Sequence, residues 1–141
     1  MEIRPIADGY AVSPQITPED VAAIREAGFT TVICNRPDGE IPPELQADTI
    51  RAAVEGAGMR FVLNPVIGGA ITMDNVKAQG AALDGAEGPV LAYCASGNRS
   101  SIVWALSQAG KQPTDDLVAA GARYGYALEQ FRPTIEQLAR G

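Results

Sequence analysis

The chain has 141 residues, of which 46% are hydrophobic and 20% charged, a balance typical of a globular protein with a real core. Its net charge of −6 argues against a nucleic-acid partner, and no apolar run approaches the ~20 residues that a membrane helix needs. The chain has no histidine, which excludes Ser-His-Asp and Cys-His catalysis and most zinc sites.

The cysteines and the N-terminal segment bear on the cellular compartment. Cys34 and Cys94 are too few for a disulfide framework, and residues 1–10 carry charges where a signal peptide would carry an apolar stretch. We therefore expect free thiols in a cytoplasmic protein. We predict no cofactor and no metal, and the sequence leaves the oligomeric state open.

Short strands alternate with helices along the chain. Strands at residues 3–6 and 10–13 flank an Asp8-Gly9 turn, and Thr17 and Pro18 begin a helix that runs to about residue 27. The later elements are predicted as strand 30–35, helix 43–57, strand 60–66, helix 73–83, strand 90–93, helices 100–109 and 114–123, and a short helix from Pro133 or Thr134. This order predicts an α/β fold, with a mostly parallel central sheet, helices on both faces and one domain over residues 1–141.

The segment from Cys94 to Ser100 joins the last strand to a helix that is apolar on nearly all sides. Its small residues let the backbone curl and turn its N–H groups inward, while the helix N-terminus and Arg99 add positive charge. This pattern predicts an anion-binding loop in which that positive field, rather than a histidine, activates Cys94 as the nucleophile. Ser100 would hydrogen-bond the thiolate or protonate a leaving group. The predicted anion-binding residues are Ala95, Ser96, Gly97, Asn98, Arg99 and, from another loop, Arg36.

The general acid is the open question of this site. Asp38 follows the buried strand 30–35, so we expect it at the same edge of the sheet as Cys94. Asp74, at a helix start, is the alternative. Each residue also has a purely structural explanation. Asp38 would then be a turn residue, and Asp74 would interact with the dipole of the helix that it begins.

Other side chains near this edge have two interpretations each. Cys34 either packs in the core or forms a disulfide with Cys94 on oxidation, and core packing is the simpler explanation. Tyr124 and Tyr126 either belong to the core or line the pocket.

Several segments resemble the phosphatase-like domain of bacterial beta-lactamase-hydrolase-like proteins, a group also classed as a sulfurtransferase family. The matching segments are Ala11 to Ser13, Gln15 to Asp20, Val32 to Glu40, Pro65-Val66, Gly68 to Thr72 and Tyr93 to Ser100. The resemblance implies the fold of dual-specificity tyrosine phosphatases and catalytic roles for Cys94 and Arg99.

One departure from the tyrosine-phosphatase pattern affects the predicted chemistry. Those enzymes space cysteine and arginine as C-x5-R, usually after histidine, whereas here the spacing is C-x4-R after Tyr93. The shorter loop resembles that of rhodanese-type sulfurtransferases and leaves less room for a phosphoryl group.

We therefore expect a cysteine enzyme acting on a small anion, with no membrane partner. Transfer of sulfane sulfur from thiosulfate or a persulfide is favoured slightly over phosphomonoester hydrolysis through a phosphocysteine. A non-catalytic domain that binds a phosphorylated or sulfated ligand is the third possibility.

Overall fold

The computed structural model describes residues 1–141 and contains one five-stranded sheet with the strand order β1-β2-β5-β3-β4. The strands are β1 (Arg4–Ala7), β2 (Tyr10–Ser13), β3 (Thr31–Cys34), β4 (Arg60–Leu63) and β5 (Val90–Tyr93). Only β1 is antiparallel to its neighbour. The mostly parallel sheet predicted from the sequence is confirmed.

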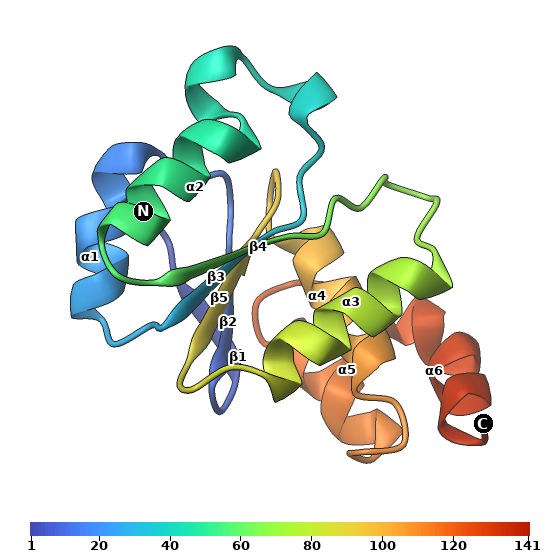
Figure 1. The fold of residues 1–141 in the computed structure, drawn as a ribbon. Helices are drawn as coiled ribbons and strands as arrows, with labels where there is room; N and C mark the ends of the chain where they lie inside the picture. Colours follow the sequence, from blue (N-terminus) through green and yellow to red (C-terminus); the bar gives the residue numbers. More distant parts are fainter.

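Helices cover both faces of the sheet, as predicted (Figure 1). The helices are α1 (Val21–Glu26), α2 (Ala47–Gly56), α3 (Met73–Asp84), α4 (Asn98–Ser107), α5 (Thr114–Ala122) and α6 (Arg132–Ala139). One face carries α1 and α2, and the other carries α3 to α6. Helix α4 is the innermost of the second group, and its Trp104 ring stacks on Tyr10 of the sheet with 5.7 Å between ring centroids.

Two predicted helices begin with separate 3-10 turns. The segments Pro18–Asp20 and Pro43–Leu45 form these turns ahead of α1 and α2, and Gln46 between the second turn and α2 is extended. The first turn runs without a break into α1, which begins at Val21. A further 3-10 turn, Leu128–Phe131, leads directly into α6, which therefore begins at Arg132.

The C-terminal ends of the parallel strands lie together along one end of the sheet. Cys34 and Ser13 both lie opposite Tyr93 in the strand register, so the residues that follow β2, β3 and β5 emerge side by side. Strand β4 ends at Leu63, earlier than predicted, because Pro65 interrupts it, although Asn64 and Val66 still donate to the carbonyls of Cys34 and Asn35. The Cys94 loop lies at this end of the sheet. None of the helices has the length and hydropathy needed to cross a membrane.

Candidate active site

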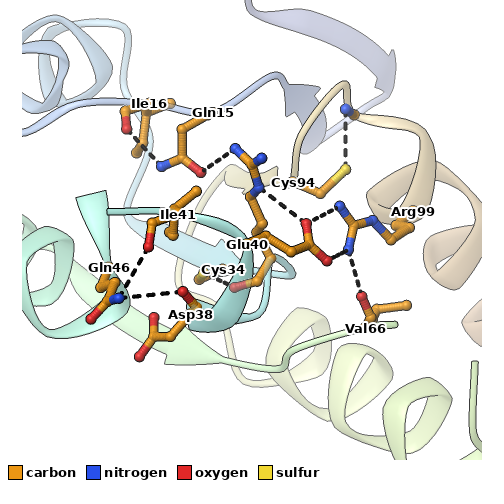
Figure 2. Close-up of polar contacts among 12 residues, drawn as sticks. Gln15, Ile16, Cys34, Asp38, Glu40, Ile41, Gln46, Val66, Cys94 and Arg99 are labelled. Carbon is orange, nitrogen blue, oxygen red and sulfur yellow. Dashed lines mark hydrogen bonds and ion pairs between the residues drawn. The ribbon is translucent and has the colours of Figure 1, made fainter. Parts of the chain in front are cut away.

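Cys94 follows β5 directly and its side chain lies inside the loop that leads to α4. The residue is 1% exposed, and its Sγ accepts a hydrogen bond from the Gly97 amide at 3.1 Å (Figure 2). Gly97 has a φ of 90°, which glycine adopts without the steric cost that a side chain would add. This left-handed residue turns the chain into α4, which starts at Asn98 rather than at the predicted Ser100.

Several loop amides are available to an anion. The N–H groups of Ala95, Ser96, Arg99 and Ser100 donate to no acceptor within the chain, and Asn98 donates only to the Ser96 hydroxyl at 3.3 Å. Unpaired N–H groups at a helix N-terminus form a partial positive charge. The N–H groups of Gly97 and Asn98 are engaged within the loop, and a role for the four unpaired ones in binding an oxyanion stays a prediction.

Arg99 makes a bidentate ion pair with Glu40. Its two terminal nitrogens donate to the Glu40 carboxylate oxygens at 2.8 Å each, and Nη1 also donates to the Val66 carbonyl at 2.8 Å. The pairing holds the pKa of the Glu40 carboxyl below its usual value and raises that of Arg99. The same carboxylate accepts from Arg36 Nε at 3.2 Å, so Glu40 bridges the two arginines predicted to bind the anion (Figure 2).

Sequence reasoning missed Glu40. It lies in the same Arg36-Pro37-Asp38-Gly39-Glu40 segment as Asp38, the residue predicted as the general acid. The spacing of Arg36 and Glu40 was the only signal, and it does not reveal that Glu40 also reaches Arg99.

Asp38 is held against the start of α2. Its Oδ1 accepts a hydrogen bond from the Ala47 amide at 2.8 Å, and its carbonyl accepts one from the Gln46 side chain at 3.3 Å. Figure 2 shows this carboxylate on the α2 side of its loop. Asp74 is exposed in the first turn of α3. A general-acid role for either residue stays a prediction.

Ser100 does not form the expected hydrogen bond with the Cys94 sulfur. Its buried hydroxyl donates to Asn35 Oδ1 at 2.9 Å, and its carbonyl accepts from the Tyr10 hydroxyl at 2.8 Å. The hydroxyl is oriented into the core because Asn35, immediately after β3, offers a buried acceptor there.

Asn35 belongs to a buried network centred on Gln79 of α3. The Gln79 amide oxygen accepts from Asn35 at 2.9 Å and from Asn64 at 2.8 Å, and its nitrogen donates to Tyr10 at 2.9 Å. The network links β2, β3, β4 and α3 to the first turn of α4, which carries Ser100.

Tyr126 supports the Cys94 loop from outside. Its hydroxyl donates to the Ser96 carbonyl at 2.9 Å and accepts from Arg4 at 2.7 Å. A Cβ added at Gly97 would collide with this hydroxyl. Tyr126 therefore contacts the back of the loop, whereas Tyr124 is largely exposed.

Cys34 is buried beneath the site. Its sulfur lies 3.3 Å from the Arg36 carbonyl, and burial raises the pKa of its thiol. The neighbouring Tyr93 hydroxyl is buried without a hydrogen-bond partner in range, and burial raises its pKa as well. This placement fits core packing, and the proposed disulfide with Cys94 stays a prediction.

Comparison with known proteins identifies relatives of this architecture. The model of the phosphatase-like domain of beta-lactamase hydrolase-like proteins matches residues 2–111. A beta-lactamase hydrolase-like protein of Xylella fastidiosa is 33% identical over 141 residues, which are 99% of this chain and 33% of the relative. The chain thus spans about a third of the length of the curated relatives it matches.

Solved structures share the fold. A Neisseria meningitidis protein, assigned provisionally as a phosphatase, has 33% sequence identity and a TM-score of 0.83, with 98% of this chain and 99% of that one covered. Kinase associated phosphatase has 11% identity and a TM-score of 0.70, with coverages of 93% and 85%, and is similar in fold alone. The predicted dual-specificity-phosphatase-like architecture is confirmed.

Proposed function

The chain belongs to the phosphatase-like domain family of beta-lactamase hydrolase-like proteins, and on that premise we propose that it hydrolyses phosphomonoesters through a phosphocysteine on Cys94. One observation carries the proposal. The Cys94 sulfur lies within a loop whose unpaired amides and Arg99 form a ready site for a phosphoryl group. Sulfur transfer, which the short loop favours, is the second candidate.

The reaction takes place in two displacements. The Cys94 thiolate attacks phosphorus, so that an S–P bond forms while the ester P–O bond breaks and the leaving oxygen takes a proton. Water then attacks the phosphocysteine, the S–P bond breaks and the thiolate returns as inorganic phosphate leaves. The loop amides and Arg99 stabilise the charge on the equatorial oxygens in both steps.

The thiolate is stabilised without a histidine. The Gly97 N–H points at the sulfur, and the N-terminus of the ten-residue helix α4 and the Arg99 guanidinium add positive potential. In the proposed mechanism these groups take the place of the imidazole of Cys-His enzymes.

The site offers no free carboxylate to protonate the leaving group. Both nearby carboxylates are engaged, Asp38 with the start of α2 and Glu40 with Arg99. Leaving groups that depart as stable anions, such as phenolates, need little help from a general acid. We therefore expect aryl phosphates to be hydrolysed faster than alkyl phosphates.

Sulfur transfer would use the same residues. The Cys94 thiolate would attack the outer sulfur of thiosulfate, forming an S–S bond and releasing sulfite, and an acceptor thiol would then remove the sulfur. The C-x4-R spacing and the engaged carboxylates favour this candidate, because it requires neither a wide loop nor a general acid. The family and the Neisseria relative favour phosphoryl transfer, which we therefore place first.

Parallel assays of the wild type and of the Cys94→Ser and Arg99→Lys variants test the proposal. We expect the wild type to hydrolyse an aryl phosphate, Cys94→Ser to lose activity, and Arg99→Lys to lose about 10²-fold or more, because lysine cannot hold an oxyanion in a fork. Brief exposure to substrate and acid quenching should leave a phosphoryl group on Cys94. Equal rates for wild type and Cys94→Ser would contradict phosphatase action, and sulfur bound to Cys94 after thiosulfate, without phosphatase activity, would establish the second candidate.

A further inference from the structure

A cavity of about 310 Å³ lies beside the Cys94 loop, between the β4–α3 connection, α4 and α6. The β4–α3 connection contributes Gly68, Gly69 and Ile71 to its wall, and α6 and the turn before it contribute Thr134 and Phe131. The cavity is distinct from the larger polar one at the opposite edge of the sheet, which is lined by Arg25, Thr30 and Arg60 and has no contact with the loop.

Helix α4 connects this cavity to the nucleophile loop. Asn98, Ile102 and Leu106 lie on one face of α4 at successive four-residue intervals, and all three line the cavity together with Arg99. Asn98 and Arg99 also belong to the Cys94 loop. An anion held by the loop would therefore carry its organic group toward the cavity along the first turn of α4.

The residues that line the cavity indicate which organic group of a substrate would bind there. Ile71, Ile102, Leu106 and Phe131 provide apolar surface, and Arg99 is the only ionisable residue in the lining. Asn98, Thr134 and Arg99 are the only polar side chains in the lining, so a sugar or polyol would set most of its hydroxyls against apolar surface, which costs free energy. A cavity of about 150 Å³ already admits benzene, so this one accommodates an aromatic ring or a branched alkyl chain.

Gly68 and Gly69 line the cavity without side chains that would fill it. A Cβ added at Gly68 would meet no atom within 4 Å, so the space beside this residue is not filled by the rest of the chain. Because Gly68 also lines the cavity, a larger side chain at this position has room beside the proposed ligand.

We propose that this cavity is a subsite for the organic part of the substrate, and that this part is an aryl or branched alkyl group rather than a sugar or polyol. The subsite rests on the proposed function, because it takes the Cys94 loop as the site of the phosphoryl group. It adds the substrate class, which neither the loop nor the family specifies.

The test measures binding without turnover. The full chain with Cys94→Ser is titrated calorimetrically with phenyl phosphate, glycerol 2-phosphate and inorganic phosphate. We expect phenyl phosphate to bind about tenfold or more tightly than glycerol 2-phosphate, because only the ring buries apolar surface in the cavity.

A substitution that fills the cavity locates the effect. Adding Gly68→Leu should weaken phenyl phosphate about tenfold and weaken inorganic phosphate much less, so that the preference for the ring disappears. The matched control is Gly56→Leu, an exposed glycine at the end of α2 where a Cβ also meets nothing within 4 Å. It should leave the preference intact.

The outcomes separate the subsite from the function. Equal binding of the two esters, or a preference that survives Gly68→Leu, would overturn the subsite while the anion site stands. If none of the three phosphates binds, the proposed function fails and the subsite fails with it. Loss of the preference in Gly56→Leu as well as in Gly68→Leu would also overturn the subsite, because the effect would not be local to the cavity.

Discussion

Glu40 places a carboxylate where a substrate oxyanion would otherwise meet Arg99. The pair is bidentate, and Arg36 contacts the same carboxylate, so the chain's own anion neutralises part of the charge intended for the ligand. An incoming anion must share or replace these contacts. At the scale of single residues, we therefore expect Glu40 to weaken any binding of anions by Arg99.

We predict that Glu40→Gln binds sulfate roughly two- to fivefold more tightly than the wild type, because the neutral amide competes less for Arg99 and the pair is partly exposed. Sulfate is suitable because it stays a dianion throughout the acidic range in which a carboxyl group titrates. Calorimetric titration provides the measurement. Weaker binding by the variant would mean that Glu40 holds Arg99 in position instead of competing for it.

The same contact predicts a pH dependence with a definite sign. Arg99 lowers the pKa of Glu40, so the carboxylate remains ionised at neutral pH and competes with the ligand there. As the pH falls through this lowered pKa, Glu40 is protonated and releases Arg99. Sulfate affinity of the wild type should then rise toward that of Glu40→Gln, whose own affinity should change little.

At the scale of elements, a buried amide network sets the position of α4 against the sheet. Gln79 on α3 contacts Asn35 and Asn64 at the ends of β3 and β4, and Asn35 and Tyr10 both contact Ser100 at the start of α4. The loop that carries Cys94 is therefore anchored at its far end by groups from four other elements. Satisfied buried networks of this kind fix one arrangement of the core, since slippage would leave polar atoms unpaired.

We expect Gln79→Ala to lower the free energy of unfolding by about 1–3 kcal/mol, because Asn35, Asn64 and Tyr10 each lose a buried partner. Urea denaturation gives the value. Gln137→Ala is the matched control, since this glutamine is exposed on α6 and should change stability by no more than about 0.5 kcal/mol. Similar losses in the two variants would show that the network contributes nothing specific.

At the scale of the molecule, the last thirty residues complete the site although the family match ends at residue 111. Leu117, Leu128 and Ile135 are buried in the same cluster as Trp104, and Tyr126 supports the Cys94 loop. The C-terminal helices are therefore part of the core that positions α4.

We predict that a chain ending at residue 111 loses cooperative unfolding, because removal of α5 and α6 exposes the apolar face of α4. Thermal melts followed by circular dichroism measure the loss. A chain lacking only Arg140 and Gly141, which are exposed, serves as the control and should melt like the wild type. A sharp transition in the shorter chain would show that residues 1–111 fold alone.

The parts of the structure that depend on local pattern were predictable from the sequence. The Cys94 loop could be recognised because small residues, a glycine and an arginine follow a four-residue apolar strand. The ends of elements were less accurate, since they depend on backbone angles such as the extended Gln46 before α2 and the left-handed Gly97 before α4.

The contacts made by long side chains were not predictable in the same way. Glu40 meets Arg99 across 59 positions and Gln79 meets Tyr10 across 69, and no spacing rule links such pairs. The slight preference for sulfur transfer rests on the short loop and on the lack of a clear general acid. It carries less weight than the kinship with phosphatase-like proteins over residues 2–111.

The burial of Cys94 has a consequence for covalent inhibitors. With 1% of the residue exposed, a bulky neutral electrophile meets backbone before it meets sulfur, whereas a small anionic one is attracted by Arg99 and the free loop amides. Selective reagents for this domain should therefore carry their reactive carbon next to a compact negative group. Neutral thiol labels, by the same reasoning, should reach this buried cysteine slowly.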